Sequence, residues 1–156
     1  MSGSAEYFDF LNKLESDPSF CYNYIKDNGL NKSHPTYEKC LETISKNAKH
    51  SRAIAENLIK GRFKLGEEAI SKDSLESYWY AKEVIKGRWE MGEQAISCDP
   101  RLSFDYASRV LRGRFELGEL TIAKNENLAY LYAREVIKGK LPEEMHNIML
   151  AKRIAA

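Results

Sequence analysis

Two columns of basic residues recur at a fixed spacing of 26 residues. Of all residues in the sequence, they are the clearest candidates for binding a ligand. One column holds Arg62, Arg88, Arg114 and Lys140; the second, two residues earlier, holds Lys60, Lys86, Arg112 and Lys138. Because packed helices lie about 10 Å apart, stacked repeats would align these cations along one edge. Such an edge suits the phosphate backbone of a nucleic acid or an acidic protein surface.

The same cations also have a use inside the fold. An acidic column follows the arginines by five residues and consists of Glu67, Glu93 and Glu119. We expect arginine and glutamate from neighbouring repeats to pair, and the earlier cations to complement the negative ends of helices. Pairing in the stack, an anionic protein partner and nucleic acid therefore stay open. The net charge of only +1 argues against a dedicated, strongly basic nucleic-acid binder.

Aromatic residues recur beside the basic columns. Tyr80, Tyr106 and Tyr132 share one column and are expected in the core, whereas Trp79 has Asp105 and Leu131 in its column. An exposed aromatic side chain near arginine is typical of protein interfaces and of base-stacking sites. The sequence therefore predicts a partner-binding surface that comprises Arg62, Arg88, Arg114, Lys86, Arg112, Trp79 and Tyr78.

No residue pattern indicates catalysis, a metal site or a cofactor. His34, His50 and His146 lie far apart and do not recur, and the three cysteines form no CxxC pair. Walker and nucleophile-elbow phrases are missing. We therefore expect a protein that is not an enzyme. Free cysteines, no signal peptide and no long apolar run favour a cytoplasmic location without a membrane span.

The positioning elements follow from the 26-residue period, which is typical of stacked helical repeats. Asn47, Asp73, Asp99 and Asn125 are expected to cap the first turn of a long helix in each repeat. Gly87 is expected to end one such helix in the left-handed conformation, just after Lys86. A shorter helix follows, in which Gly92 is expected to pack against the recurring alanine of the long helix, such as Ala81.

The predicted architecture is an all-α, right-handed α-solenoid of short helical hairpins, built as a single domain over 1–156. Regular repeats cover 47–140, degenerate repeats cover 1–46, and a capping helix covers 141–156. The apolar residues of 141–156 leave two alternatives, in which this helix packs against the last long helix or meets a partner such as a second copy of the chain.

The phrase "KGRxExGExxI…DxxxSYxYAxxV" resembles short helical-repeat proteins of bacteriophage type, over residues 47–140 in particular. The resemblance implies a helical repeat fold and a viral origin, with the host cytoplasm as the location, and no established activity. Our leading hypothesis is a non-enzymatic module that binds a protein, such as a host defence protein that it modulates or inhibits. The alternatives are a nucleic-acid binder that uses the basic columns and a homo-oligomeric structural protein joined through 141–156.

Overall fold

The computed structural model describes residues 2–155, and every regular element in that range is a helix. Helices pack against their neighbours in sequence order, which confirms the predicted all-α helical-repeat fold. The chain divides into two compact units, Met1–Ile70 and Ser71–Ala156. The prediction of a single domain over 1–156 stays a prediction.

The first unit contains two helical pairs and the start of the regular repeats. Its helices are α1 (Ser2–Ser16), α2 (Pro18–Asn28), α3 (Tyr37–Ser45), α4 (Ala48–Ile54), the π-helix η1 (Ala55–Ile59), the 3-10 helix η2 (Lys64–Gly66) and α5 (Glu67–Ser71). Helix α3 packs against both α1 and α2. Asp17 caps the start of α2, because its carboxylate accepts a hydrogen bond of 2.9 Å from the Phe20 N–H.

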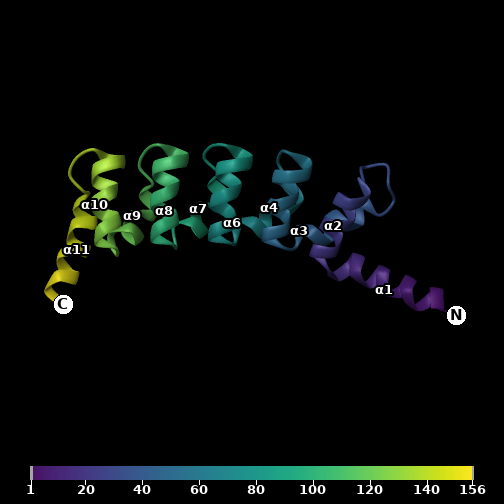
Figure 1. Cartoon of the computed structure of the whole chain (residues 1–156). Helices are drawn as coiled ribbons and strands as arrows, with labels where there is room; N and C mark the ends of the chain where they lie inside the picture. Colours follow the sequence, from purple (N-terminus) through teal and green to yellow (C-terminus); the bar gives the residue numbers. More distant parts are fainter. Residues whose placement is uncertain (1, 156) are drawn as a thin grey trace. The chain divides into compact units, whose positions relative to one another are not determined.

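The second unit repeats one hairpin. Its helices are α6 (Ser74–Trp79), the π-helix η3 (Tyr80–Ile85), α7 (Glu90–Ile96), α8 (Pro100–Asp105), η4 (Tyr106–Leu111), α9 (Glu116–Ala123), α10 (Glu126–Tyr132), η5 (Ala133–Ile137) and α11 (Glu143–Ala155). The rods α6–η3, α8–η4 and α10–η5 stand side by side in Figure 1, and the turns after them lie along one edge.

The expected caps at the start of the long helices are confirmed. The side chains of Asp73, Asp99 and Asn125 accept hydrogen bonds of 2.8 to 3.1 Å from the backbone N–H three residues later. Asn47 does the same in the first unit. Each cap satisfies one of the free N–H groups that open a helix, so these residues fix where each repeat begins.

The ends of the long helices differ from the prediction. They widen into π-helical turns, and the left-handed residue is Lys86 (φ 58°), not Gly87. The Ala81 carbonyl accepts hydrogen bonds from the N–H groups of both Lys86 and Gly87. The same turn recurs with Lys60, Arg112 and Lys138 as the left-handed residues. The wide turn therefore moves the left-handed position one residue earlier, from glycine to a cation.

Gly92 is a packing position as predicted, but its neighbour differs. A Cβ at Gly92 would lie 2.6 Å from the Trp89 ring and 2.8 Å from the Ser77 side chain, rather than against Ala81. Gly118 meets Phe115 and Ser103 in the same way. These glycines let the short helix approach a serine of the long helix, and Ser103 itself donates a 3.0 Å hydrogen bond to the Ile96 carbonyl.

The last helix, α11, packs against α9, and Met145 in its first turns is fully buried. Its far end remains apolar and open, with Leu150 42% and Ile154 86% exposed. The structure therefore contains features of both alternatives for 141–156. None of the helices over residues 2–155 has the length and apolar character needed to cross a membrane.

Candidate binding surface

Each arginine of the first basic column forms a two-pronged ion pair with the glutamate five residues later. Arg114 donates hydrogen bonds of 2.8 and 2.9 Å to the two carboxylate oxygens of Glu119. Arg88 is paired with Glu93, and Arg62 with Glu67, in the same manner. The glutamates are buried and the arginines about half exposed. Each pair lies within one repeat, which corrects the expectation that neighbouring repeats would supply its two members.

The tyrosine column links neighbouring repeats through hydrogen bonds. The Tyr132 hydroxyl donates a 2.9 Å hydrogen bond to Glu119 and accepts one of 2.9 Å from the Phe115 N–H. Tyr106 makes the equivalent bonds to Glu93 and the Trp89 N–H. We call each set of arginine, glutamate and following tyrosine a clamp. The tyrosines are fully buried, as the sequence predicted.

The clamp controls the protonation of its members. Burial acts to raise the pKa of Glu119, but the hydrogen bonds from Arg114 and Tyr132, together with the Arg114 charge, outweigh burial and lower that pKa below its ordinary value of 4.5. Burial raises the pKa of Tyr106 to about 12. Glu119 therefore stays ionised and Tyr106 neutral near pH 7, which is the state that their hydrogen bonds require.

The second basic column is available to a ligand. Lys86 and Arg112 are exposed on left-handed turns, and within residues 2–155 neither forms an ion pair. In the left-handed region a side chain other than glycine or asparagine costs on the order of 1 kcal/mol. The charge is therefore held at a position where the backbone favours glycine.

The two aromatic candidates separate in the structure. Tyr78 is only 3% exposed, so the expectation that it forms part of an exposed surface is wrong; it belongs to the core. Trp79 is half-buried, packs its ring edgewise against Tyr78, and carries the Lys82 ammonium 4.4 Å from its ring centroid. Trp79 therefore stays a candidate contact residue.

Lys82 also lines a basic hollow that was not predicted from the sequence. A hollow of about 400 Å³ between the ends of η3 and η4 is lined by Lys82, Lys86, Gly87, Arg109, Val110 and Arg112. It contains two residues of the predicted surface, Lys86 and Arg112. Among the residues that the structure describes, no acidic side chain lines it. Comparison of columns would have flagged Lys82 and Arg109, because Ser108 and Glu135 hold their positions one repeat later.

An exposed apolar row was also missed. Leu65, Met91 and Leu117 recur at the spacing of 26, and each is about half exposed. Each follows an arginine of a clamp by three residues. The recurrence of an apolar residue is visible in the sequence, but its exposure is not, because neighbouring positions of the same short helix are buried.

Among the described residues, no group of three or more histidine, cysteine, aspartate or glutamate side chains could hold a metal ion. Cys21, Cys40 and Cys98 are free thiols, as expected. The Nδ1 atom of His34 and the hydroxyl of Thr36 are hydrogen-bonded at 2.7 Å.

Comparison of the chain with protein-family models, curated proteins and solved structures finds no match.

Proposed function

We propose that this protein is a non-enzymatic module that binds another protein along its repeats. The observation that carries the proposal is the row of Met91 and Leu117, each half exposed and each three residues after a half-exposed arginine. Methionine and arginine are enriched in protein interfaces, and a central apolar contact bordered by charge is their usual composition. Nucleic acid would make little use of an exposed apolar row.

The resemblance to phage helical-repeat proteins supports a narrower version of the proposal. In that version the partner is a host protein, such as a defence protein, which the chain modulates or inhibits in the host cytoplasm. Lysate from a bacterial host is therefore the first source in which to seek the partner.

The test uses the apolar row rather than the arginines. Reversal of Arg88 or Arg114 would bring two carboxylates together at a buried glutamate, so loss of binding could reflect loss of folding. We would compare the native chain with Met91→Glu/Leu117→Glu in capture from lysate. The captured protein would then be purified and its affinity measured.

A matched control is Leu75→Glu, because Leu75 is 49% exposed and Arg101 and Asn127 hold its column in later repeats. We expect the double variant to bind its purified partner at least about tenfold more weakly, and the control to bind as the native chain does. Equal binding by all three proteins would contradict the proposal, and so would the absence of any captured protein.

Nucleic-acid binding is a second candidate because Lys86, Arg112 and Lys138 are exposed on successive turns. Phosphate contacts make affinity fall steeply with salt concentration. Titration of a single-stranded oligonucleotide at rising ionic strength tests this candidate, and nuclease treatment of the lysate removes its contribution from the capture experiment.

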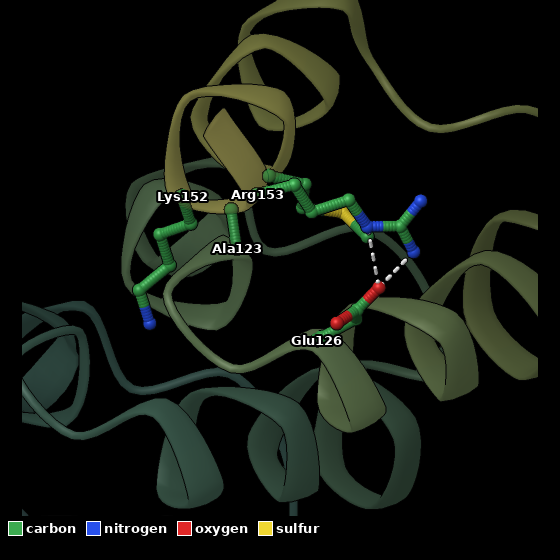
Figure 2. A pocket seen from close by; sticks show the side chains of 5 residues that line it. Ala123, Glu126, Lys152 and Arg153 are labelled. Carbon is green, nitrogen blue, oxygen red and sulfur yellow. Dashed lines mark hydrogen bonds and ion pairs between the residues drawn. The ribbon is translucent and has the colours of Figure 1, made fainter. Parts of the chain in front are cut away.

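Homo-oligomer formation is a third candidate, favoured by the exposed Leu150 and Ile154 of α11. In Figure 2, Arg153 of α11 reaches Glu126 of α10 across a pocket also lined by Ala123, Met149 and Lys152. The ion pair ties α11 to its own chain, so Ile154→Glu is a milder test than truncation at Lys140. A mass that falls to the monomer supports this candidate, and an unchanged mass excludes it.

A further inference from the structure

The basic hollow between the ends of η3 and η4 differs from the equivalent positions of the next repeat pair. It is lined by Lys82, Lys86, Arg109 and Arg112 without an acid. One repeat later, the equivalent positions hold Ser108, Arg112, Glu135 and Lys138. The difference comes from two substitutions in the repeat, which give Lys82 and Arg109 in one pair and Ser108 and Glu135 in the next.

Not all four cations form ion pairs with acidic residues of the chain. Lys82 contacts Glu83 at 3.1 Å, and Arg109 contacts Asp105 at 3.3 Å, but neither acid lines the hollow. Asp105 already receives a 3.0 Å hydrogen bond from Arg101. Lys86 and Arg112 form no ion pair among residues 2–155. The hollow therefore has a surplus of positive charge. Its N–H donors have no acidic partner among the residues that line it.

Gly87 has no role in the fold that requires glycine. Its φ is outside the left-handed region, and a Cβ added there would meet no atom within 4 Å. Since Gly87 also lines the hollow, its bare backbone leaves space for close approach of a bound group.

We propose that this hollow binds the phosphate groups of a small phosphorylated molecule. Guanidinium groups match phosphate oxygens with paired hydrogen bonds, and lysine adds charge. A nucleic-acid backbone would require the same cations at successive repeats, whereas Lys82 and Arg109 occur together at one pair only. The local concentration of charge therefore favours a discrete anion with several charges. This inference is independent of protein binding by Met91 and Leu117.

The test is calorimetric titration of the full chain with inorganic phosphate, pyrophosphate and ATP at low ionic strength, where exposed charges are least screened. We expect one pyrophosphate per chain. Lys82→Ser/Arg109→Asn introduces residues that the chain itself has at these columns, in Ser108 and Asn57, and leaves Arg101 on Asp105. Loss of two charge-assisted contacts should weaken pyrophosphate binding at least about tenfold.

The reciprocal variant is the sharper arm. Ser108→Lys/Glu135→Arg recreates the residue set of the hollow around Arg112, Gly113 and Lys138. We expect the stoichiometry to rise from one to two pyrophosphates per chain, with circular dichroism unchanged. Tighter binding of ATP than of pyrophosphate would assign a nucleotide, and equal binding would assign the phosphate groups alone as the recognised part.

Three results would overturn the proposal. The first is no heat of binding for any of the three anions, and the second is equal pyrophosphate affinity in the native chain and in Lys82→Ser/Arg109→Asn. The third is tighter binding of a single-stranded oligonucleotide than of pyrophosphate with no effect of that double variant, because this would indicate a continuous basic edge.

Discussion

Helix α2 and the long helices of the second unit end in nearly the same backbone conformation with different residues. In the first unit, α2 ends at Gly29 with φ 58°. In the second unit, the long helices end at Lys86 with φ 58° and at Arg112 with φ 52°. Gly29 shows that this chain can end a helix with the residue that the conformation favours. The conformation therefore does not require a cation, and Lys86 and Arg112 stay candidates for contacts outside the turn.

The two regions also join their helices by different means. In the first unit, the Thr43 hydroxyl donates a 2.6 Å hydrogen bond to the Leu14 carbonyl, beside the buried thiols of Cys21 and Cys40. In the second unit, a charged clamp joins successive repeats through Tyr106 and Tyr132. Helices of this chain can therefore pack without a clamp. Where a clamp is present, its buried glutamate needs the opposite charge of the arginine.

The largest expected effect is therefore the removal of a clamp arginine. Arg114→Gln would leave the ionised Glu119, which is 6% exposed, without its opposite charge. We expect the free energy of unfolding to fall by about 3 kcal/mol, because the buried carboxylate would lose its charged hydrogen-bond donor. Denaturant unfolding measures this change, with the exposed Lys13→Gln in α1 as the control. A loss below that of the control would mean that the clamp contributes nothing.

The same pair predicts a dependence on pH. Because the pKa of folded Glu119 is below its ordinary value of 4.5, its stabilising contribution is complete above that value. The contribution is lost as pH falls through the lowered folded pKa. The stability difference between the native chain and Arg114→Gln should therefore shrink as pH is lowered below 4.5. A difference that stays constant between pH 7 and pH 3 would contradict the ionised clamp.

Two glycine columns give the next comparison. A Cβ at Gly118 would lie 2.6 Å from the Phe115 ring and 2.7 Å from Ser103, whereas Gly87 has open space. We expect Gly118→Val to lower the unfolding free energy by about 2 kcal/mol, within the range for overpacked cores. Gly87→Ala should leave it nearly unchanged. Similar thermal midpoints for the two variants would show that the two columns are not distinct.

The smallest expected effect concerns Trp89. Its indole Nε1 is buried and has no hydrogen-bond partner among the described residues, while Phe63 and Phe115 hold its column elsewhere. Trp89→Phe removes an unsatisfied donor at the cost of some apolar contact. We expect a stability unchanged or raised by up to about 1 kcal/mol. A loss of several kcal/mol would mean that the tryptophan shape is specifically required.

The sequence was sufficient for features governed by local rules. The 26-residue period and the caps at Asp73, Asp99 and Asn125 are confirmed, because a capping side chain acts on N–H groups three residues away. The packing role of Gly92 is confirmed as well, although its neighbour is Ser77 rather than Ala81. Which face of a helix meets its neighbour depends on the rotation of the helix about its own axis. The 26-residue period does not determine that rotation.

The binding surface was less predictable. The widened π-helical turn shifted the left-handed position from Gly87 to Lys86, since the Ala81 carbonyl accepts two N–H groups there. Tyr78 proved to be buried, whereas Met91 is exposed. Lys82 and Arg109 are distant in sequence and meet only because η3 packs against η4. The residue types along the chain do not by themselves specify which side chains of different helices come together.

In this interpretation the repeated phrase has two separable parts, a clamp that stabilises the stack and a left-handed cation that is available to a ligand. The most direct test is the unfolding free energy of Lys86→Gly/Arg112→Gly. Glycine suits the φ values of both positions. We therefore expect a stability equal to that of the native chain or higher by about 1 kcal/mol. A loss as large as that of Arg114→Gln would show that the cations maintain the fold, and would contradict the account.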